Sequence, residues 1–268
     1  MENKIKKRVI FTAIFGNYDD VPHIAEQMVD KNCDYLLFSD RDIVPEPPWE
    51  IIKIDTSPHG FSATNRWIKL CSHQWLTDYQ ESIYIDGNIQ LKSSLSSIFD
   101  LLTEKNHCVL IKHPKRDRVL TELLACFVMK KISFFECLHH AAKLGHNQFF
   151  DNYHLTVNRL ICRRLDIEKV NNVFESVFQS YLSGPRRDQL HMQPVLQQNK
   201  LKPRLLSPQD AARFFNIKPH KNDASISRYR RKIKNLKIET RKALLRMPVY
   251  MLLYGIYIVS FWIGKKRG

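Results

Sequence analysis

A carboxylate and a carboxamide follow a short apolar run in the first third of the chain. The run 82–85 is rich in β-branched and aromatic residues, as is typical of a buried strand, and Asp86, Gly87 and Asn88 come directly after it. Ligands of open α/β sheets bind outside the carboxyl ends of strands, and carboxylate and amide oxygens suit Mg²⁺ or Mn²⁺ carrying phosphates. The tripeptide therefore indicates either a metal–diphosphate site or an ordinary turn, because Asp-Gly and Gly-Asn are common turn formers.

Further polar clusters fall at the predicted ends of strands or starts of helices. Arg66 and Lys69 lie three residues apart and share a helix face, where two cations either hold a diphosphate or simply face solvent. The remaining clusters are Gly16–Asp19, Ser39–Asp40, His113–Arg116 and Arg187–Gln189.

The elements that must position these clusters alternate between strands and helices. Strands are predicted at 8–15, 35–38, 49–54, 82–86 and 108–111, and a strand pair at 155–165. Helices are predicted at 63–79, 95–104, 119–144, 167–182 and 192–198. This alternation predicts an α/β fold with a mostly parallel sheet, helices on both faces and a site on the strand-end loops. No G-x-G-x-x-G or G-x-x-x-x-G-K-[ST] motif is present, which counts against dinucleotide and P-loop sites.

Composition indicates a globular protein with structural thiols. The 268 residues are 44% hydrophobic, enough to bury a sizeable core. The six cysteines form no C-x-x-C pair and stand singly in apolar stretches, which favours free thiols in a reducing compartment. The apolar run before Gly16 is too short for the core of a secretion signal, and we expect none.

The positive charge is concentrated at the end of the chain. The net charge is +15, and residues 221–268 alone hold 13 Lys and Arg against two acids. Such asymmetry indicates a polyanionic partner for this segment. We therefore divide the chain into a domain at 1–215, a basic linker or amphipathic helix at 216–246 and a hydrophobic segment at 247–268.

The hydrophobic segment predicts association with a membrane. Residues 247–264 carry no charge and approach the roughly 20 residues of a membrane span, and they include aromatic residues of the interfacial type. Together with the basic residues before it, the segment predicts an anchor on an anionic membrane surface through 226–268, with the body on the cytoplasmic face. The segment either spans the bilayer or lies in one leaflet. A C-terminal core helix is the alternative.

Six segments, taken in order, resemble one family. They are 11–19 (FTAIFGNYD), 38–40 (FSD), 66–69 (R-x-x-K), 82–89 (SIYIDGNI), 113–116 (HP-x-R) and 187–190 (RDQL). The family is glycosyltransferase-like and includes plant proteins named for mucilage and turgor phenotypes and bacterial proteins encoded near surface-polysaccharide genes. The resemblance covers about residues 8–200 and implies a GT-A-like fold, in which a Rossmann-like nucleotide-binding half joins an acceptor-binding half.

The resemblance implies a site for a nucleotide-sugar donor. Tyr18 would stack on the base and Asp40 would bind the base or ribose. Asp86 and Asn88, with His220 as a further candidate, would bind a divalent metal, Mn²⁺ or Mg²⁺. Asn88 stands where many GT-A enzymes have a second Asp, and its neutral amide is a weaker ligand. The full donor set would be Thr12, Ala13, Phe15, Gly16, Tyr18, Asp40, Arg66, Lys69, Asp86 and Asn88.

The resemblance also implies catalytic and acceptor-binding residues. Asp188 and Gln189 resemble the Asp-Gln pair near the reacting sugar of several GT-A transferases. Asp188 would then act as a general base or stabilise positive charge on the sugar, unless it only caps the following helix. His113 and Arg116 would bind the acceptor.

These observations predict a glycosyltransferase of undetermined stereochemistry. It would move a sugar from a nucleotide-diphosphate donor to a surface polysaccharide, such as lipopolysaccharide or capsule, or to a lipid-linked glycan. Two alternatives are a membrane-associated lipid hydrolase of the ceramide type and a noncatalytic polyanion-binding protein. The chain lacks G-x-S-x-G and H-E-x-x-H, which counts against the hydrolase, and we expect no nucleic-acid partner because no recognition motif is present.

Overall fold

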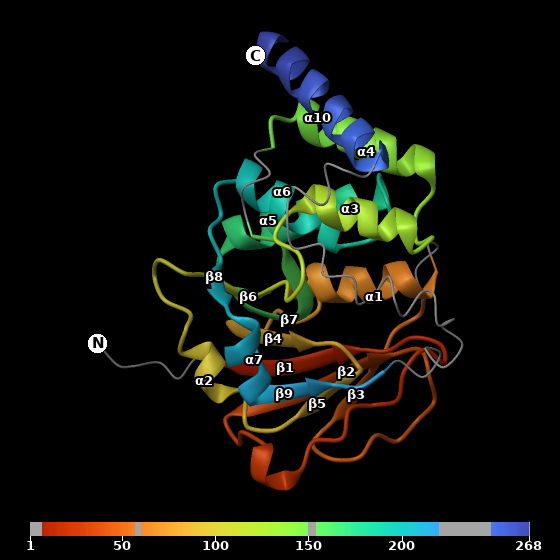
Figure 1. Cartoon of the computed structure of the whole chain (residues 1–268). Helices are drawn as coiled ribbons and strands as arrows, with labels where there is room; N and C mark the ends of the chain where they lie inside the picture. The colour runs from red at the N-terminus through yellow and green to blue at the C-terminus, as the bar shows by residue number, and fades with distance from the viewer. Residues whose placement is uncertain (1–6, 57–59, 150–153, 220–247, 268) are drawn as a thin grey trace. The chain divides into compact units, whose positions relative to one another are not determined.

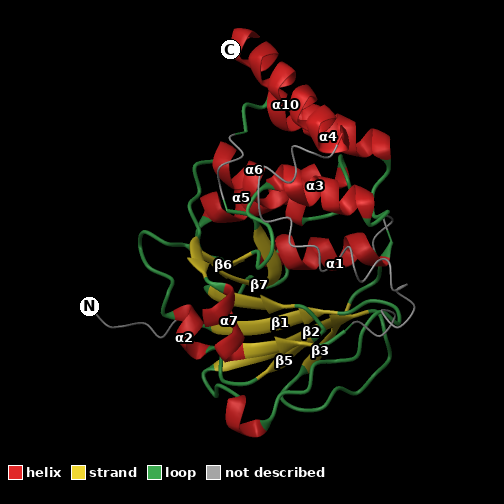
Figure 2. Ribbon diagram, viewed as in Figure 1, coloured by secondary structure: helices red, strands yellow, loops and turns green. Residues whose placement is uncertain are grey.

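The structure is a computed structural model, which describes residues 7–56, 60–149, 154–219 and 248–267 (Figures 1 and 2). The chain forms two compact units that interleave along the sequence. The first comprises the described residues within 1–111, 157–178 and 202–225, and the second those within 112–156, 179–201 and 226–268.

A seven-stranded, mostly parallel mixed sheet lies almost entirely within the first unit, and its strand order is β3-β2-β1-β4-β7-β6-β8. Its strands are β1 (Arg8–Ala13), β2 (Cys33–Ser39), β3 (Glu50–Lys53), β4 (Glu81–Ile85), β6 (Cys108–Lys112), β7 (Thr156–Arg164) and β8 (Arg204–Leu206). β1 pairs in parallel with β2 and β4, β2 with β3, and β6 with β8, whereas β4 and β7 are antiparallel. The α/β class with a mostly parallel sheet flanked by helices is therefore confirmed.

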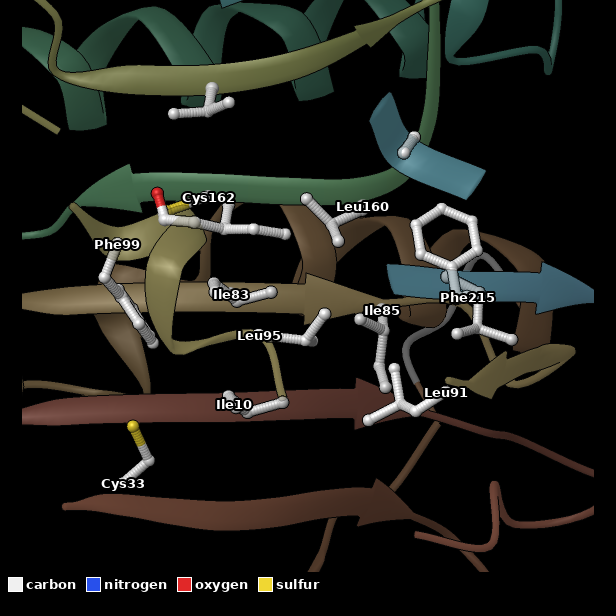
Figure 3. Packing of buried hydrophobic residues seen from close by; sticks show 14 of the residues in the cluster. Ile10, Cys33, Ile83, Ile85, Leu91, Leu95, Phe99, Leu160, Cys162 and Phe215 are labelled. Atoms are coloured by element: carbon white, nitrogen blue, oxygen red, sulfur yellow. The ribbon is translucent and has the colours of Figure 1, made fainter. Parts of the chain in front are cut away.

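The two faces of this sheet carry different layers because side chains alternate along each strand. Ile10, Ile83 and Ile85 lie on one face, where they pack with α2 (Ser96–Phe99), α7 (Pro208–Phe214) and the small antiparallel sheet of β5 (Ile89–Leu91) and β9 (Phe215–Ile217) (Figure 3). Phe11 and Tyr84 lie on the other face, with ring centroids 5.4 Å apart, next to α1 (Phe61–Leu70).

The second unit is helical. It holds α3 (Val119–Val128), α4 (Phe134–His146), α6 (Gln189–Gln198), α10 (Pro248–Arg267) and the end of α5 (Glu168–Leu182). The predicted helix at 119–144 is interrupted because Lys130 adopts a φ of 55° and Ser133 opens α4 with a capping box to Glu136. α10 packs along α4 (Figure 1), and its Leu253 and Tyr257 belong to the buried core of this unit.

Several predicted elements differ from the observed ones. The helix at 95–104 is only the single turn α2, and the helix at 63–79 is α1 followed by a short 3₁₀ turn at Ser72–Gln74. The strand pair at 155–165 is the single strand β7, and α6 begins three residues before the predicted 192. Strand β9 crosses the predicted domain boundary at 215. All six cysteines are free and buried, as predicted.

Within the described ranges, no helix has the length and apolar content that crossing a bilayer requires. His220 and the basic segment 226–246 lie outside the described residues.

Two glycines test how closely α10 packs on α4. A Cβ at Gly145 would lie 2.1 Å from the carbonyl oxygen of Tyr257 on α10, whereas one at Gly255 would meet nothing within 4 Å. Gly145→Ala is therefore expected to lower the free energy of unfolding by about 1–3 kcal/mol, and Gly255→Ala to leave it unchanged or raise it. Urea denaturation followed by circular dichroism measures both; equal effects of the two substitutions would contradict this packing.

Candidate functional site

The strand order places a change of direction between β1 and β4. From β1 the chain builds outward to β2 and β3, and it then returns through α1 to β4 on the other side of β1. These four strands run parallel, so the loops after β1 and β4 leave the same edge of the sheet. Ligands of open α/β sheets bind at such a switch point. This edge is therefore the candidate site of the first unit.

The loops after β1, β2 and β4 contact one another at this edge. Gly16 has a φ of +58°, which favours glycine, and donates its N–H to Asp40 Oδ1 at 2.9 Å. A Cβ at Gly87 would lie 3.0 Å from Ile14 Cδ1 and 3.3 Å from the Cβ of Asp19. The structure thus brings together three loops that hold predicted site residues.

A buried ammonium group lies beneath the carboxylate of Asp86. Lys69 is 2% exposed, and its Nζ is 3.2 Å from Asp86 Oδ1 and 4.7 Å from the centroid of the Tyr84 ring. The Tyr84 hydroxyl donates to the same Asp86 oxygen at 2.9 Å. Burial, and then the charge of Asp86, raises the pKa of Tyr84 well above its ordinary value, so Tyr84 remains a donor. These contacts orient Asp86, whose side chain is 25% exposed.

Asn65, which sequence reasoning missed, ties α1 to the end of β1. Its amide nitrogen donates to the carbonyl oxygen of Ala13 at 2.6 Å, and its amide oxygen accepts from the guanidinium of Arg66 at 2.7 Å. Asn65 therefore holds both the β1 loop and Arg66 in place. Its position next to the predicted Arg66–Lys69 pair was the only signal in the sequence.

Two exposed aromatic side chains lie at or next to the β1 loop. Tyr18, the predicted base-stacking residue, is 55% exposed. Phe61 opens α1 and is 53% exposed, and its ring approaches Gly16 so closely that a Cβ there would lie 3.2 Å away. Sequence reasoning missed Phe61. Exposed aromatic rings at the edge of a site are suited to stacking on a flat ligand.

Five residues of the predicted donor set have buried side chains, and Lys69 and Asn88 are two of them. Thr12, Ala13 and Phe15 are almost fully buried, so their side chains shape the β1 loop from within. Asp40 already accepts the N–H of Gly16 through one oxygen. The surface that this part of the site offers to a ligand is therefore formed by the backbone after β1 and by Tyr18.

Asn88 is used to hold strand β9. Its side-chain amide nitrogen donates to the backbone carbonyl oxygen of Lys218 at 2.9 Å. The backbone carbonyl oxygen of Asn88 accepts the backbone N–H of Lys218, also at 2.9 Å. The Asn88 side chain is buried, including its amide oxygen. The amide nitrogen of Asn88 is thus used within the protein, and the metal-binding role of its amide oxygen stays a prediction.

The carboxylate of Asp86 is suited to its predicted role as a ligand to a divalent metal. Its Oδ1 is held by Lys69 and Tyr84, and hydrogen-bonded carboxylates of this kind are typical of oriented metal ligands. Mg²⁺ is commonly bound by one or two carboxylates together with substrate phosphates. The described part of the chain contains no group of three or more His, Cys, Asp and Glu side chains placed to hold an ion.

The predicted acceptor residues lie together in the second unit. Arg116 Nε donates to the buried carboxylate of Glu122, and His113 Nε2 lies 3.9 Å from the same oxygen. His113 Nδ1 accepts the backbone N–H of Lys115 at 3.1 Å and that of Arg116 at 2.9 Å. Sequence reasoning missed Glu122, although a lone acid in the apolar segment 119–128 was a signal. The charge of Arg116 is thus compensated within the cluster.

Asp188 and Gln189 also lie in the second unit, at the start of α6. Asp188 occupies the N-cap position, but its side chain makes no capping hydrogen bond; its backbone carbonyl accepts from the N–H of Met192 instead. Capping therefore does not account for this carboxylate, which is 8% exposed. The catalytic role implied by the resemblance stays a prediction.

His191 fixes the loop that leads to Asp188. Its ring nitrogens lie 2.8 Å from the carbonyl oxygen of Pro185 and 2.9 Å from the hydroxyl of Ser180. A Cβ at Gly184 would lie 2.8 Å from the His191 ring. The loop before α6 is thus packed around a buried histidine, which sequence reasoning did not single out.

Comparison with known protein families gave no match, and comparison with curated proteins gave none either.

The burial of His191 predicts a loss of stability in acid. Burial lowers its pKa from 6.5 to about 4, so between these pH values the unfolded chain binds the proton and the folded chain does not. Stability therefore falls as the pH falls, by about 1–2 kcal/mol from pH 7 to pH 5 for this residue.

Urea denaturation at several pH values measures this effect. His191→Gln keeps hydrogen-bonding atoms without the titration and is expected to reduce the pH dependence. The part that comes from His140, whose pKa burial lowers to about 3, should remain. His154→Gln, at an exposed histidine, serves as the control. If His191→Gln and the wild type lose stability equally as the pH falls, His191 does not contribute to the acid dependence.

Proposed function

We propose that the protein is a glycosyltransferase whose first unit binds the donor, a nucleotide diphosphate sugar, at the switch point between β1 and β4. The observation that carries the proposal is the convergence at this edge of Gly16, Asp40, Lys69 and Asp86, which come from four separate segments. A GT-A-like arrangement belongs to the same proposal, since the parallel order β3-β2-β1-β4 is compatible with a Rossmann-like nucleotide-binding half.

The exposed aromatic rings support binding of the nucleoside. Tyr18 is well placed on the β1 loop to stack on a base, and Phe61 next to Gly16 offers a second flat surface. Backbone N–H groups of a loop after a parallel strand commonly contact phosphates. The nucleoside would thus lie over the β1 loop.

The charge arrangement supports binding of the diphosphate. An isolated carboxylate would repel an anionic donor, but the ammonium of Lys69, 3.2 Å from Asp86 Oδ1, compensates that charge from inside the protein. The exposed part of Asp86 would hold a divalent ion, which neutralises the leaving diphosphate when bound. Arg66, fixed through Asn65, adds a positive charge to the same helix.

In the second unit, Asp188 and Gln189 would take the catalytic role, and His113 and Arg116 would contact the acceptor, a glycan or lipid-linked glycan. Asp188 would accept a proton from an acceptor hydroxyl or stabilise positive charge on the sugar. The lipid-hydrolase alternative gains no specific support from the described residues.

Isothermal titration of the full chain with UDP, GDP, CDP and ADP, each with Mn²⁺ or with a chelator, tests the proposal. One nucleoside diphosphate is expected to bind in the presence of Mn²⁺ and at least tenfold more weakly without it. Without nucleotide, Mn²⁺ is expected to bind the wild type no more tightly than it binds the Asp86→Asn variant. The reason is that the described residues supply too few ligands to hold the ion without phosphates.

Matched variants locate the site. Asp86→Asn removes the metal-binding charge but keeps an oxygen for Lys69 and Tyr84, and it should abolish the Mn²⁺ effect. Asp100→Asn removes a carboxylate that is 69% exposed in the same unit and should bind as the wild type does. The proposal fails if the folded chain binds none of the nucleotides, or if Asp86→Asn binds with unchanged affinity and metal dependence.

A further inference from the structure

Helix α10 has one buried and one exposed apolar face. Its inner face packs on α4: Leu253 and Tyr257 are buried, and the Tyr257 hydroxyl donates to the carbonyl oxygen of Phe149. Its outer face exposes five large apolar side chains, each by 44% or more: Met251, Leu252, Val259, Trp262 and Ile263. Residues 252, 259, 262 and 263 recur at helical spacing and so line one side of the helix.

The charges that helix α10 itself carries are all positive. The sequence of α10 contains no acid, and Lys265, Lys266 and Arg267 close the helix. Lys265 Nζ lies 5.2 Å from the centroid of the Trp262 ring, so one of these cations borders the apolar face directly. In the sequence, the 48 residues from 221 onward hold 13 Lys and Arg against two acids. A partner that binds the outer face of α10 must therefore present both apolar groups and negative charge.

We propose that the outer face of α10 binds an anionic lipid surface, with the helix axis in the plane of the bilayer. Its apolar side chains would enter the boundary between headgroups and acyl chains, Trp262 would lie at the interface, and the terminal lysines would contact lipid phosphates. This inference rests on the second unit alone and is independent of the proposed donor site.

The inner contacts of α10 favour the in-plane orientation. The helix meets α4 at backbone distance, since a Cβ at Gly264 would lie 2.1 Å from the carbonyl oxygen of His146 and one at Gly145 equally close to Tyr257. A helix held in this way can offer only its outer face to lipid. A second copy of the chain is a poorer occupant because it would bring the same cations to the same face.

Flotation of the full chain with lipid vesicles tests the proposal. The protein is expected to float with vesicles that contain phosphatidylglycerol and to bind phosphatidylcholine vesicles much more weakly. Val259→Ser combined with Trp262→Ser should reduce the partition coefficient by about tenfold or more, because the apolar area that enters the bilayer is lost. Val44→Ser makes the same change at the 99% exposed Val44 of the first unit and should have no effect.

Quenching by brominated phospholipids tests the orientation of the face. Vesicles with bromine on the acyl chains should quench part of the tryptophan fluorescence of the wild type. Trp262→Phe retains an apolar side chain, so it should float as before while the quenching is lost. Trp49, which is 5% exposed in the first unit, supplies the control: Trp49→Phe should leave the quenching in place.

Three results would overturn the proposal. One is a folded full chain, verified by circular dichroism, that does not float with anionic vesicles. Another is flotation that the Val259/Trp262 double substitution leaves unchanged. The third is a double variant with an altered oligomeric state in gel filtration and unaltered vesicle binding, which would assign the face to a second copy of the chain.

Discussion

The contact between Lys69 and Asp86 is the interaction on which the candidate site depends. Removing a lysine ammonium from water costs several kcal/mol unless a carboxylate and hydrogen bonds compensate it. Lys69 is almost fully buried, and its partner stands directly after β4. The pair therefore fixes α1 against the end of that strand and at the same time orients the carboxylate. Loss of either partner would leave a charge in or near the core, so the two residues depend on each other.

The remaining parts of the site follow from this constraint and from the strand order. α1 connects β3 to β4, so fixing its face at Lys69 also places Asn65, which holds the end of β1, and Phe61 beside Gly16. Asp40 after β2 then closes the loop at Gly16. A parallel order with β1 next to β4 is what brings these segments to one edge. The structure thus explains why Ala13 and Asn65, which lie 52 positions apart, meet: β1 ends next to the helix that leads into β4.

The sequence allowed the strands and the strand-end loops to be predicted, but not the use of each side chain. Runs such as 82–85 are apolar and β-branched, which a buried strand requires, and the clusters after β1, β2 and β4 meet at one edge. Local pattern could not show that Asn88 holds β9, because its partner Lys218 lies 130 residues later. Asn65 was missed for the same reason, since its partner Ala13 lies 52 residues earlier. Glu122 and His191 bind partners that lie 6 and 11 residues away, and they were missed because the local pattern does not show that a polar side chain is buried. The interrupted helix at 119–144 depended on the backbone at Lys130, which periodicity does not record.

Hydrogen–deuterium exchange of the full chain, with and without a nucleoside diphosphate and Mn²⁺, tests the central claim most directly. The account predicts slower exchange in peptides that cover 13–19, 61–70 and 85–89, because the ligand would lie on these three segments at the edge of β1 and β4. Peptides from β8 and α7, at 204–214, should be unaffected. Protection confined to other segments, or nucleotide binding without protection in these three, would contradict it.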